Sequence, residues 1–494
     1  MNYNNPVIRG FYPDPSICKV CDDYYLVTSS FEYLPGVPLF TSKNLVDWEQ
    51  MGYCLTRDSQ IDLHGTFCSG GIYAPTIRYY DGMFYMITTN ISKGNFIVYT
   101  NDLKKGFSNP IWIDIKGIDP SLYFEDGKYY IQASCMTFIH QAEIDIKTGA
   151  LLSEPKIISE GCGHRDVEAP HIYKINGWYY LMCAEGGTRD GHMVTVQRSR
   201  FLYGPYEKSP NTPMVSNKDK SKEKLQAVGH ADLIQDNSGN WWIVALATRP
   251  YKHRHHLGRE TILVPVIWTK DGWPMVENSY VPSEITCEGI GITKQKEESF
   301  FDDFDQNGMR ADYNTIRDFI INQYSLKDKA GYLTLRGNGE DLNTLSSPVF
   351  LGVRQKEYIC RFEVKLLTEL EEGGTAGLAV LIDNHHHMEI GLRNSQGILE
   401  LYTKRTVDDI VIITKAFDYL EEKIIIGIEA DELHYKFYYI SEKNEKIIIN
   451  EAMVKHMSVE MSDSPFTGVF GGMFIENRGT AYFDWFKYEE SPKP

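Results

Sequence analysis

The sequence predicts an all-β protein, with a five-bladed β-propeller over residues 1–295 and a β-sandwich over residues 296–494. Two observations lead to this prediction. A short motif recurs five times between residues 14 and 242, and beyond residue 300 the chain reads as alternating strands with almost no helical periodicity. The length of 494 residues exceeds what one ordinary core accommodates, so two domains are expected.

Each copy of the motif joins a short strand, a tight turn and an aromatic second strand, which is the pattern of a β-hairpin. The aromatic pair follows ten residues after the start of the first four units and eleven after the start of the last. The units open with Asp14-Pro15-Ser16-Ile17, Ala74-Pro75-Thr76-Ile77, Asp119-Pro120-Ser121-Leu122, Ala169-Pro170-His171-Ile172 and His230-Ala231-Asp232-Leu233. They begin roughly every 45 to 60 residues, the length of one four-stranded blade, so five units predict five blades.

The propeller is expected to end near residue 295, after a strand at 261–268 and an irregular stretch with Pro274, Pro282 and Gly289. The second domain then shows no blade repeat. Its expected strands cover 358–366, 376–382, 398–402, 424–428, 433–439 and 481–487. Strands of this length and alternation predict two packed sheets.

Candidate catalytic residues follow from the repeat, because the first strand of every blade lines the central channel. Asp14, Asp119 and His230 open their units, and Glu168 stands one position before its unit. An alternative interpretation is that each Asp only caps its own turn. Crowded carboxylates, however, acquire split pKa values. Glycoside hydrolysis needs such a pair, since one carboxylic acid protonates the leaving oxygen and a second carboxylate activates water.

The composition restricts the classes of molecule that the protein is expected to bind. The net charge of −17 argues against nucleic acid and anionic membranes, and no apolar run is long enough to span a bilayer. A neutral oligosaccharide is the expected substrate, and homo-oligomerisation stays open. The N-terminal residues contain no basic segment followed by an apolar one, so we expect a cytoplasmic protein. The nine cysteines are then expected to be reduced core residues.

These motifs resemble glycoside hydrolase family 43, in particular its two-domain β-xylosidases and α-L-arabinofuranosidases, along the whole chain. The segments that carry the resemblance are residues 5–17, Gly70-Gly71-Ile72-Tyr73-Ala74-Pro75, Asp119-Pro120-Ser121, Glu168-Ala169-Pro170-His171 and Leu257-Gly258-Arg259-Glu260-Thr261. The resemblance implies that Asp14 is the general base, Glu168 the general acid, and Asp119 the residue that orients the acid and raises its pKa. It also implies inversion of the anomeric configuration, with the carboxyls of Asp14 and Glu168 roughly 6.5 to 9.5 Å apart.

The same resemblance implies a substrate-binding shell of Phe31, Tyr73, Thr188 and Arg259. His230 matches an axial histidine that in several relatives touches the sugar or helps to hold a hydrated Ca²⁺ in the channel, and a hydrogen-bonded core histidine is the alternative. No other cofactor is expected.

The C-terminal half resembles the concanavalin-like sandwich of the long xylosidases in this family. There a loop narrows the pocket, and Phe466 matches the position that contributes an aromatic ring to it. A place in the sandwich core is the alternative for Phe466. A narrowed blind pocket implies exo action on chain ends.

Two departures leave the choice between xylose and arabinose open, because Tyr73 stands where family xylosidases commonly have Trp, and Glu168-Ala169-Pro170 replaces the frequent Glu-Gly-Pro. The leading hypothesis is an inverting exo-pentosidase. A non-catalytic carbohydrate-binding propeller and a retaining, fructan-cleaving propeller are the alternatives, the latter with carboxyls near 5.5 Å apart. The histidine runs at 253–256 and 385–387 lack the ligand spacing of a structural metal site.

Overall fold

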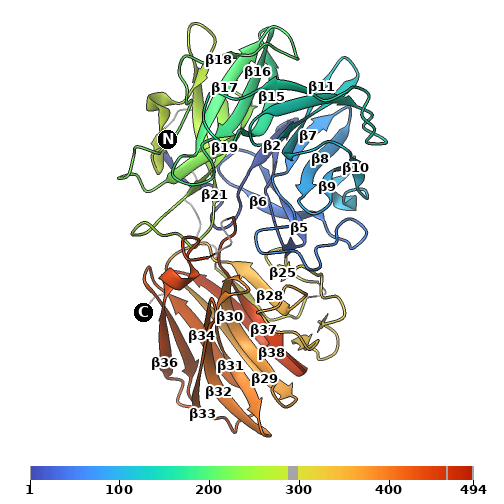
Figure 1. Ribbon diagram of the computed structural model, residues 1–494. Helices are drawn as coiled ribbons and strands as arrows, with labels where there is room; N and C mark the ends of the chain where they lie inside the picture. The colour runs from blue at the N-terminus through green and yellow to red at the C-terminus, as the bar shows by residue number, and fades with distance from the viewer. Residues whose placement is uncertain (1, 287–298, 307, 463–465, 492–494) are drawn as a thin grey trace.

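The computed structural model describes residues 2–286, 299–306, 308–462 and 466–491. Within these residues the chain is almost entirely β, and its helical elements are the short 3₁₀ turns η1 (Leu103–Lys105), η2 (Glu277–Ser279) and η3 (Val454–Met457). No helix in the described part is both long and apolar enough to cross a membrane. Figure 1 shows two β domains, with the N-terminal domain above the C-terminal one.

The N-terminal domain contains five four-stranded antiparallel sheets, in agreement with the five repeat units. The first sheet comprises β2 (Ser16–Val20), β3 (Asp23–Val27), β5 (Gly36–Ser42) and β6 (Glu49–Leu55). The second comprises β7 (Thr76–Tyr80), β8 (Met83–Asn90), β9 (Gly94–Thr100) and β10 (Ile111–Ile113). The third comprises β11 (Ile118–Glu125), β12 (Lys128–Ser134), β13 (Ile139–Ile144) and β14 (Lys156–Ser159). The fourth comprises β15 (Glu168–Ile175), β16 (Trp178–Glu185), β17 (Met193–Ser199) and β18 (Glu207–Lys208), and the fifth β19 (Gln226–Gln235), β20 (Trp241–Thr248), β21 (Glu260–Trp268) and β22 (Pro274–Met275).

The five sheets form a closed ring. Their first strands contact one another in chain order, and β19 of the last sheet contacts β2 of the first. The N-terminal segment strengthens this closure, since β1 (Asn2–Asn4) pairs with β23 (Glu284–Thr286) and the Val7 N–H donates to the Thr261 carbonyl at 2.9 Å. The arrangement is a β-propeller, so the first strand of each blade lies at the axis as predicted.

The C-terminal domain is a sandwich of two antiparallel sheets around one large apolar core. One sheet has the order β26 (Tyr324–Ser325), β27 (Leu333–Arg336), β38 (Gly479–Glu490), β29 (Cys360–Leu370), β34 (Ile424–Ala430), β35 (His434–Ile440) and β36 (Lys446–Met453), and β24 (Phe300–Asp302) also pairs with β38. The other has the order β28 (Val349–Arg354), β37 (Phe470–Glu476), β30 (Thr375–Asp383), β31 (His386–Ser395), β32 (Ile398–Val407) and β33 (Ile410–Asp418). All six strand segments predicted from the sequence overlap these strands.

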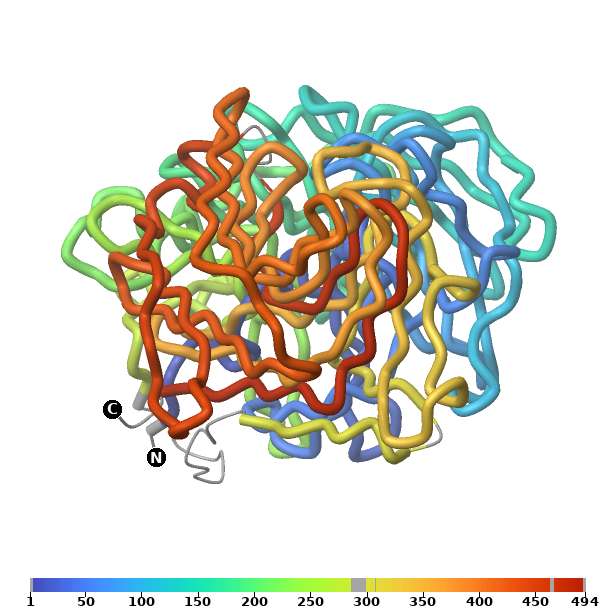
Figure 2. The backbone as a smooth tube through the Cα atoms, turned by 90° about the horizontal axis from the view of Figure 1, so that it is seen from below, coloured from blue at the N-terminus to red at the C-terminus, as the bar shows by residue number. Residues whose placement is uncertain are grey.

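The two domains share an apolar cluster. Phe11, Phe31 and Tyr33 of the propeller pack against residues of β28, β30 and β37, so the outer face of the six-stranded sheet is buried against the propeller. The short strand β4 (Tyr33–Leu34) pairs with β25 (Thr315–Ile316), and the Arg354 Nε donates to the Phe11 carbonyl at 2.7 Å. Viewed from below, the sandwich covers the middle of the propeller (Figure 2). The domains therefore meet close to the propeller axis.

Two further sequence predictions concern this fold. The expected domain boundary between residues 295 and 296 lies outside the described residues. All eight cysteines that the structure describes are free thiols. Only Cys18, Cys54, Cys183 and Cys360 are buried, and Cys21 is exposed, so the expectation of core positions is correct for half of them.

Candidate active site

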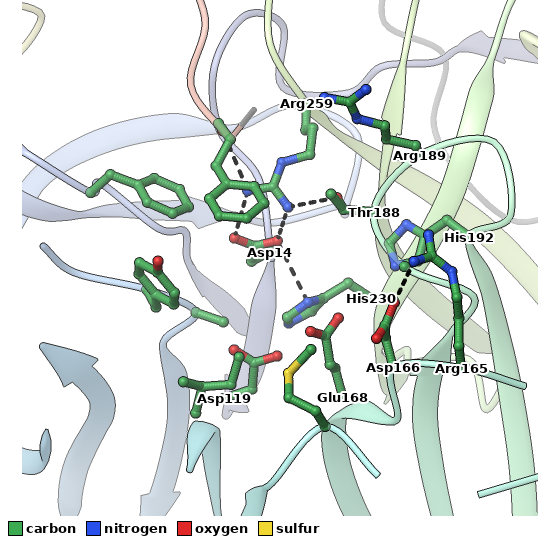
Figure 3. Close-up of a pocket in the computed structure, with 17 residues that line it drawn as sticks. Asp14, Asp119, Arg165, Asp166, Glu168, Thr188, Arg189, His192, His230 and Arg259 are labelled. Carbon is green, nitrogen blue, oxygen red and sulfur yellow. Dashed lines mark hydrogen bonds and ion pairs between the residues drawn. The ribbon is translucent and has the colours of Figure 1, made fainter. Parts of the chain in front are cut away.

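A pocket of about 310 Å³ opens at the propeller axis. It contains all nine residues predicted from the sequence, namely Asp14, Phe31, Tyr73, Asp119, Glu168, Thr188, His230, Arg259 and Phe466. Figure 3 shows the carboxyl groups of Asp14, Asp119 and Glu168 gathered in this pocket, with Arg259 on the far side of Asp14 from the other two. Positions up to 452 residues apart in the chain therefore line one cavity.

The backbone directs these side chains into the pocket. Asp14, Asp119, Ala169 and His230, which open four of the five blades, all have a positive φ between 50° and 56°. In the third and fourth blades the first strand also carries a bulge at this point, between Ile118 and Ser121 and between Glu168 and His171. Bulges and sparsely populated backbone conformations re-aim side chains next to functional sites. The repeat thus supplies a bent strand start at each place where an axial side chain is needed.

Asp14 is buried and surrounded by donors. Arg259 binds both carboxylate oxygens, with Nη1 to Oδ1 at 2.9 Å and Nη2 to Oδ2 at 3.3 Å, and the Ser29 hydroxyl donates to Oδ2 at 2.5 Å. Burial alone raises the pKa of Asp14, but the positive charge of Arg259 and the hydrogen bond from Ser29 hold this pKa below its ordinary value. Asp14 is therefore ionised near neutral pH.

His230 lies beside this carboxylate, with its Nδ1 3.5 Å from Asp14 Oδ1. Burial lowers the pKa of His230, and nearby Arg259 lowers it further, although Asp14 opposes both effects. The imidazole is therefore neutral near pH 7. Arg259 remains the cation that stabilises the ionised form of Asp14.

Glu168 has the opposite electrostatic environment. Burial raises its pKa to about 7, and the negative charges of Asp166 and Asp14 add to the effect. Asp119 is buried beside it, and burial together with the charges of Glu168 and Asp14 raises the pKa of Asp119 well above its ordinary value. Asp119 Oδ2 also accepts a hydrogen bond from the Ala169 N–H at 3.2 Å, which ties it to the backbone next to Glu168. This pair therefore retains a proton at a pH where Asp14 is ionised.

Three aromatic rings form a wall of the pocket. Phe466 from the sandwich stacks on Phe31 with ring centroids 5.7 Å apart, and Tyr73 lies 5.3 Å from Phe31 and 6.0 Å from Phe466. The Phe466 backbone is held on both sides, since its N–H donates to the Ser69 hydroxyl at 3.2 Å and its carbonyl accepts from Arg259 Nη2 at 3.3 Å. The sandwich thus supplies part of the pocket wall.

Arg259 connects these parts. Besides Asp14 and the Phe466 carbonyl, its guanidinium donates to Thr188 Oγ1 at 3.1 Å. Thr188 belongs to the loop after β16, so one side chain of the fifth blade contacts a loop of the fourth blade, the N-terminal Asp14 and the sandwich. Polar groups of Arg259 and Thr188 thereby converge with the aromatic wall, as is typical of sugar sites.

Ala74, which opens the second repeat unit, also lines the pocket, as expected for an axial residue. Sequence reasoning did not identify seven other pocket residues: Ile118, Met136, Arg165, Asp166, Gly187, Arg189 and His192. Asp166 is notable because it lies two residues before Glu168 and forms an ion pair with Arg165, Nη1 to Oδ2, at 3.1 Å. His192 is buried, and its ring lies so close to Gly229 that a Cβ there would be 2.4 Å from it. Ile118 begins β11, and the other six lie in loops between strands, where the repeat carries no signal. The spacing of Asp166 from Glu168 was the one available clue.

A second charge pair is buried between the innermost strands of the propeller. Arg78 of β7 donates from Nη1 to Asp232 Oδ2 at 2.7 Å and from Nη2 to Asp232 Oδ1 at 3.2 Å, and the Ser16 and Tyr173 hydroxyls also donate to Asp232. These contacts link the innermost strands of four blades. Asp232 is buried and its pKa is lowered, because Arg78 outweighs the effect of burial.

The surroundings of His230 do not fit a cation held by several protein ligands. Within the described ranges no group of three or more His, Cys, Asp or Glu residues could hold a metal ion. The carboxylate two residues along the strand, Asp232, is engaged by the Arg78 guanidinium. Calcium in the channel therefore stays a prediction without a matching ligand set among these residues, and no chemical step is assigned to it.

Comparison with known proteins decides the family. Residues 3–274 match the family model described as glycosyl hydrolases family 43, and residues 301–489 match the beta xylosidase C-terminal concanavalin A-like domain. The chain belongs to glycoside hydrolase family 43. The second match confirms the sequence prediction of a concanavalin-like sandwich behind the propeller.

Curated relatives of this family 43 chain match it over almost its whole length. The non-reducing end alpha-L-arabinofuranosidase BoGH43B of Bacteroides ovatus is 38% identical, over 98% of this chain and 94% of the relative. A xylosidase/arabinosidase of Butyrivibrio fibrisolvens is 36% identical, over 96% of each chain. Neither supports the alternative of a non-catalytic binding protein.

Solved structures agree. The GH43B protein of the Bacteroides ovatus xyloglucan PUL superposes with a TM-score of 0.95 at 37% identity, over 99% of this chain and 100% of that one. A xylan beta-1,4-xylosidase of Bacillus halodurans gives a TM-score of 0.92 at 31% identity, with the same coverage. The chain is accordingly a glycoside hydrolase with the propeller and sandwich of its family.

Proposed function

We propose that this chain is an inverting, exo-acting glycosidase that releases terminal pentoses, β-D-xylose or α-L-arabinofuranose, from neutral oligosaccharides. The observation that supports the proposal is that one pocket contains two carboxyl groups in different protonation states, since Asp14 is held ionised and the pKa of Glu168 is raised to about 7. An inverting glycosidase needs a base and an acid in these two states at the same pH.

In the proposed reaction, the Asp14 carboxylate removes a proton from a water molecule as that water attacks the anomeric carbon. Glu168 donates its proton to the glycosidic oxygen as the bond to the leaving sugar breaks. Asp119, buried beside Glu168, accepts a hydrogen bond from the Ala169 N–H and so positions the backbone that carries the acid. The neutral ring of His230 and the guanidinium of Arg259 remain beside Asp14, where they can bind sugar hydroxyls.

The shape of the pocket supports action on chain ends. A volume of about 310 Å³ is at the lower end of the range for small-molecule sites, and Phe31, Tyr73 and Phe466 close one side of it. A terminal pentose can stack on these rings, while a continuous polysaccharide would have to displace Phe466. Relatives named for xylose and for arabinose release both match this chain, so both sugars belong to the proposal.

Turnover of 4-nitrophenyl β-D-xyloside and α-L-arabinofuranoside, with the product anomer followed by NMR, tests this proposal. The wild type should hydrolyse at least one of the two and invert its configuration. Asp14→Ala should lower kcat on these substrates by about three orders of magnitude or more. Glu168→Ala should cause a loss of that size on short oligosaccharides and a smaller loss on the 4-nitrophenyl substrates, whose leaving group needs little help from an acid. Retention of configuration, or little change in either variant, would refute the mechanism.

A further inference from the structure

Glu32 is a buried carboxylate beside the aromatic wall, and the proposed mechanism does not use it. It follows Phe31 directly in the chain and is 2% exposed. Both of its carboxylate oxygens accept from the Ser69 N–H at 3.1 Å. Burial of an ionisable group is costly unless its partners replace the lost water. The partners of Glu32 belong to the segments that build the pocket wall, which gives this carboxylate a connection to the site.

The segment that contains Ser69 also carries Tyr73, and it runs antiparallel to the chain at Phe31. The Phe31 N–H donates to the Ile72 carbonyl at 2.8 Å, and the Ile72 N–H donates to the Phe31 carbonyl at 3.1 Å. Gly71 permits this close approach, since its φ is +83° and a Cβ there would be 2.3 Å from the Phe31 carbonyl oxygen. The contact at Ser69 adds a side-chain bond to this backbone bridge. The rings of Phe31 and Tyr73 are therefore held by one paired unit.

Ser69 connects this unit to the sandwich. Its hydroxyl accepts from the Phe466 N–H at 3.2 Å, while its own N–H donates to Glu32. Ser69 is buried and has a φ of 58°, a conformation that a non-glycine residue keeps only where its surroundings hold it. The ring of Phe466 stacks on Phe31 with the centroids 5.7 Å apart. The two stacked rings are thus joined through one serine and one carboxylate.

The positive charge near Glu32 comes from the other domain. Arg317 is buried, and its N–H donates to the Glu32 carbonyl at 2.8 Å. Burial raises the pKa of Glu32 to about 7, and the charge of Arg317 opposes this effect. The Arg317 guanidinium donates to the Thr66 carbonyl at 2.5 Å and to Cys68 Sγ at 3.1 Å. These contacts fix the propeller loop that leads to Ser69 against the sandwich.

We propose that Glu32 is a positioning residue for substrate binding: through Ser69 its carboxylate keeps the two stacked phenylalanine rings in place, and it thereby sets how tightly the terminal pentose binds. Glu32 acts without contacting the sugar, since it is not one of the described residues that line the pocket. The base Asp14 is held by other contacts, from Arg259 and Ser29, so the effect should fall on KM rather than on kcat. That the sugar is a pentose rests on the proposed function, whereas the geometry of the rings does not.

Steady-state kinetics on short pentose oligosaccharides compares Glu32→Leu with Glu32→Gln. Leu offers no acceptor to the Ser69 N–H, so KM should rise about tenfold while kcat falls by less than about threefold. Gln removes the charge but keeps an amide oxygen that can accept, so KM should stay within about twofold of the wild-type value. The Tm of the Gln variant should nevertheless fall, because Arg317 loses its counter-charge. A KM that rises equally in both variants, or in neither, would overturn the proposal.

A double-mutant cycle with Phe466→Ala separates positioning of the ring from a general loss of stability. If Glu32 acts through the Phe466 ring, Glu32→Leu should raise KM only about twofold in the Phe466→Ala background. Ser69→Ala is the milder change, since it removes only the acceptor of the Phe466 N–H. It should raise KM about three- to fivefold in the wild type and lose this effect in the same background, and it serves as the test if Glu32→Leu does not fold. Effects on KM that simply add in these cycles would refute the proposal.

Glu476→Leu is the matched control. Glu476 is a carboxylate of the sandwich that is 4% exposed and accepts from the Leu342 N–H at 3.0 Å, and it is not one of the pocket residues. This variant should lower the Tm while KM stays within about twofold of the wild-type value. If it raises KM as much as Glu32→Leu does, the loss of any buried carboxylate is sufficient and the proposal fails.

Crystal structures of the Glu32 variants test the geometry without any substrate. In Glu32→Leu the centroids of Phe31 and Phe466 should separate by about 1 Å or more beyond their 5.7 Å, whereas in Glu32→Gln they should not. An unchanged separation in Glu32→Leu would overturn the positioning role even in an active enzyme. A wild type that hydrolyses no pentoside contradicts the proposed function instead, and a shifted ring in Glu32→Leu would still support the positioning role.

Discussion

Replacing Glu168 by Gln should remove the acid and at the same time stabilise the protein at alkaline pH. The folded chain holds the Glu168 proton up to a pKa of about 7, whereas the ordinary value of 4.5 applies to the unfolded chain. Between these two values the folded state binds more protons, so its stability falls as the pH rises through this window. The difference of about 2.5 pKa units, at 1.36 kcal/mol per unit, corresponds to about 3 kcal/mol above pH 7.

The Gln variant cannot ionise and avoids this cost. Its stabilisation over the wild type should be about 3 kcal/mol at pH 8 and about 1 kcal/mol at pH 5, where the wild-type cost is mostly absent. Differential scanning calorimetry at both pH values measures the effect as a rise in Tm of several degrees at pH 8 and a much smaller rise at pH 5. Glu154→Gln, at an exposed position, is the control and should change Tm little at either pH.

The same Gln variant should lose most of its activity at both pH values. An increase in Tm that is equal at pH 5 and pH 8 would show that the amide packs better rather than that a charge was removed. A decrease in Tm at pH 8 would refute the raised pKa of Glu168, and with it the electrostatic reasoning about the acid.

Three other perturbations follow from the contacts. Arg259→Ala removes the main cation beside Asp14, so burial should then raise the pKa of Asp14. The acidic limb of the pH profile of kcat/KM should therefore move to higher pH. A limb that does not move would contradict the pairing of Arg259 with Asp14. Phe466→Ala should raise KM for short substrates about tenfold, which corresponds to about 1.4 kcal/mol, with a smaller effect on kcat. If steady-state kinetics show an unchanged KM, Phe466 does not contact the sugar. Asp232→Asn leaves the buried Arg78 without its anion and should destabilise the propeller by about 3 to 5 kcal/mol, and a Tm within one degree of the wild type would refute this.

The architecture could be predicted because it repeats. Five similar hairpin units restrict the fold strongly, and a blade's first strand lies at the axis whatever its loops do. The positions of Asp14, Asp119 and His230 follow from this rule alone. Glu168 lies one residue before its unit, and the reason became visible only in the structure, where a bulge between Glu168 and His171 brings the earlier residue into the pocket.

The remaining parts of the site could not be derived from the repeat. Asp166, Arg165 and His192 stand in loops whose course depends on tertiary contacts, such as the carboxylate of Glu185, which accepts from the N–H groups of Cys162 and His164 at 2.7 and 3.0 Å. Phe466 was reached only through resemblance, because nothing in its local sequence shows that a sandwich loop extends to a distant propeller.

The contacts of Ser69 and Arg259 with the Phe466 backbone mean that part of the pocket wall comes from a different domain than the acid and the base. The acid and the base belong to a ring whose strand starts tolerate little change. Phe466, one of the three aromatic rings of that wall, belongs to the other domain. Substitutions there could alter which chain ends enter the pocket while the proton-transfer groups keep their positions, a route by which enzymes with the same catalytic apparatus could diverge in the sugars they accept.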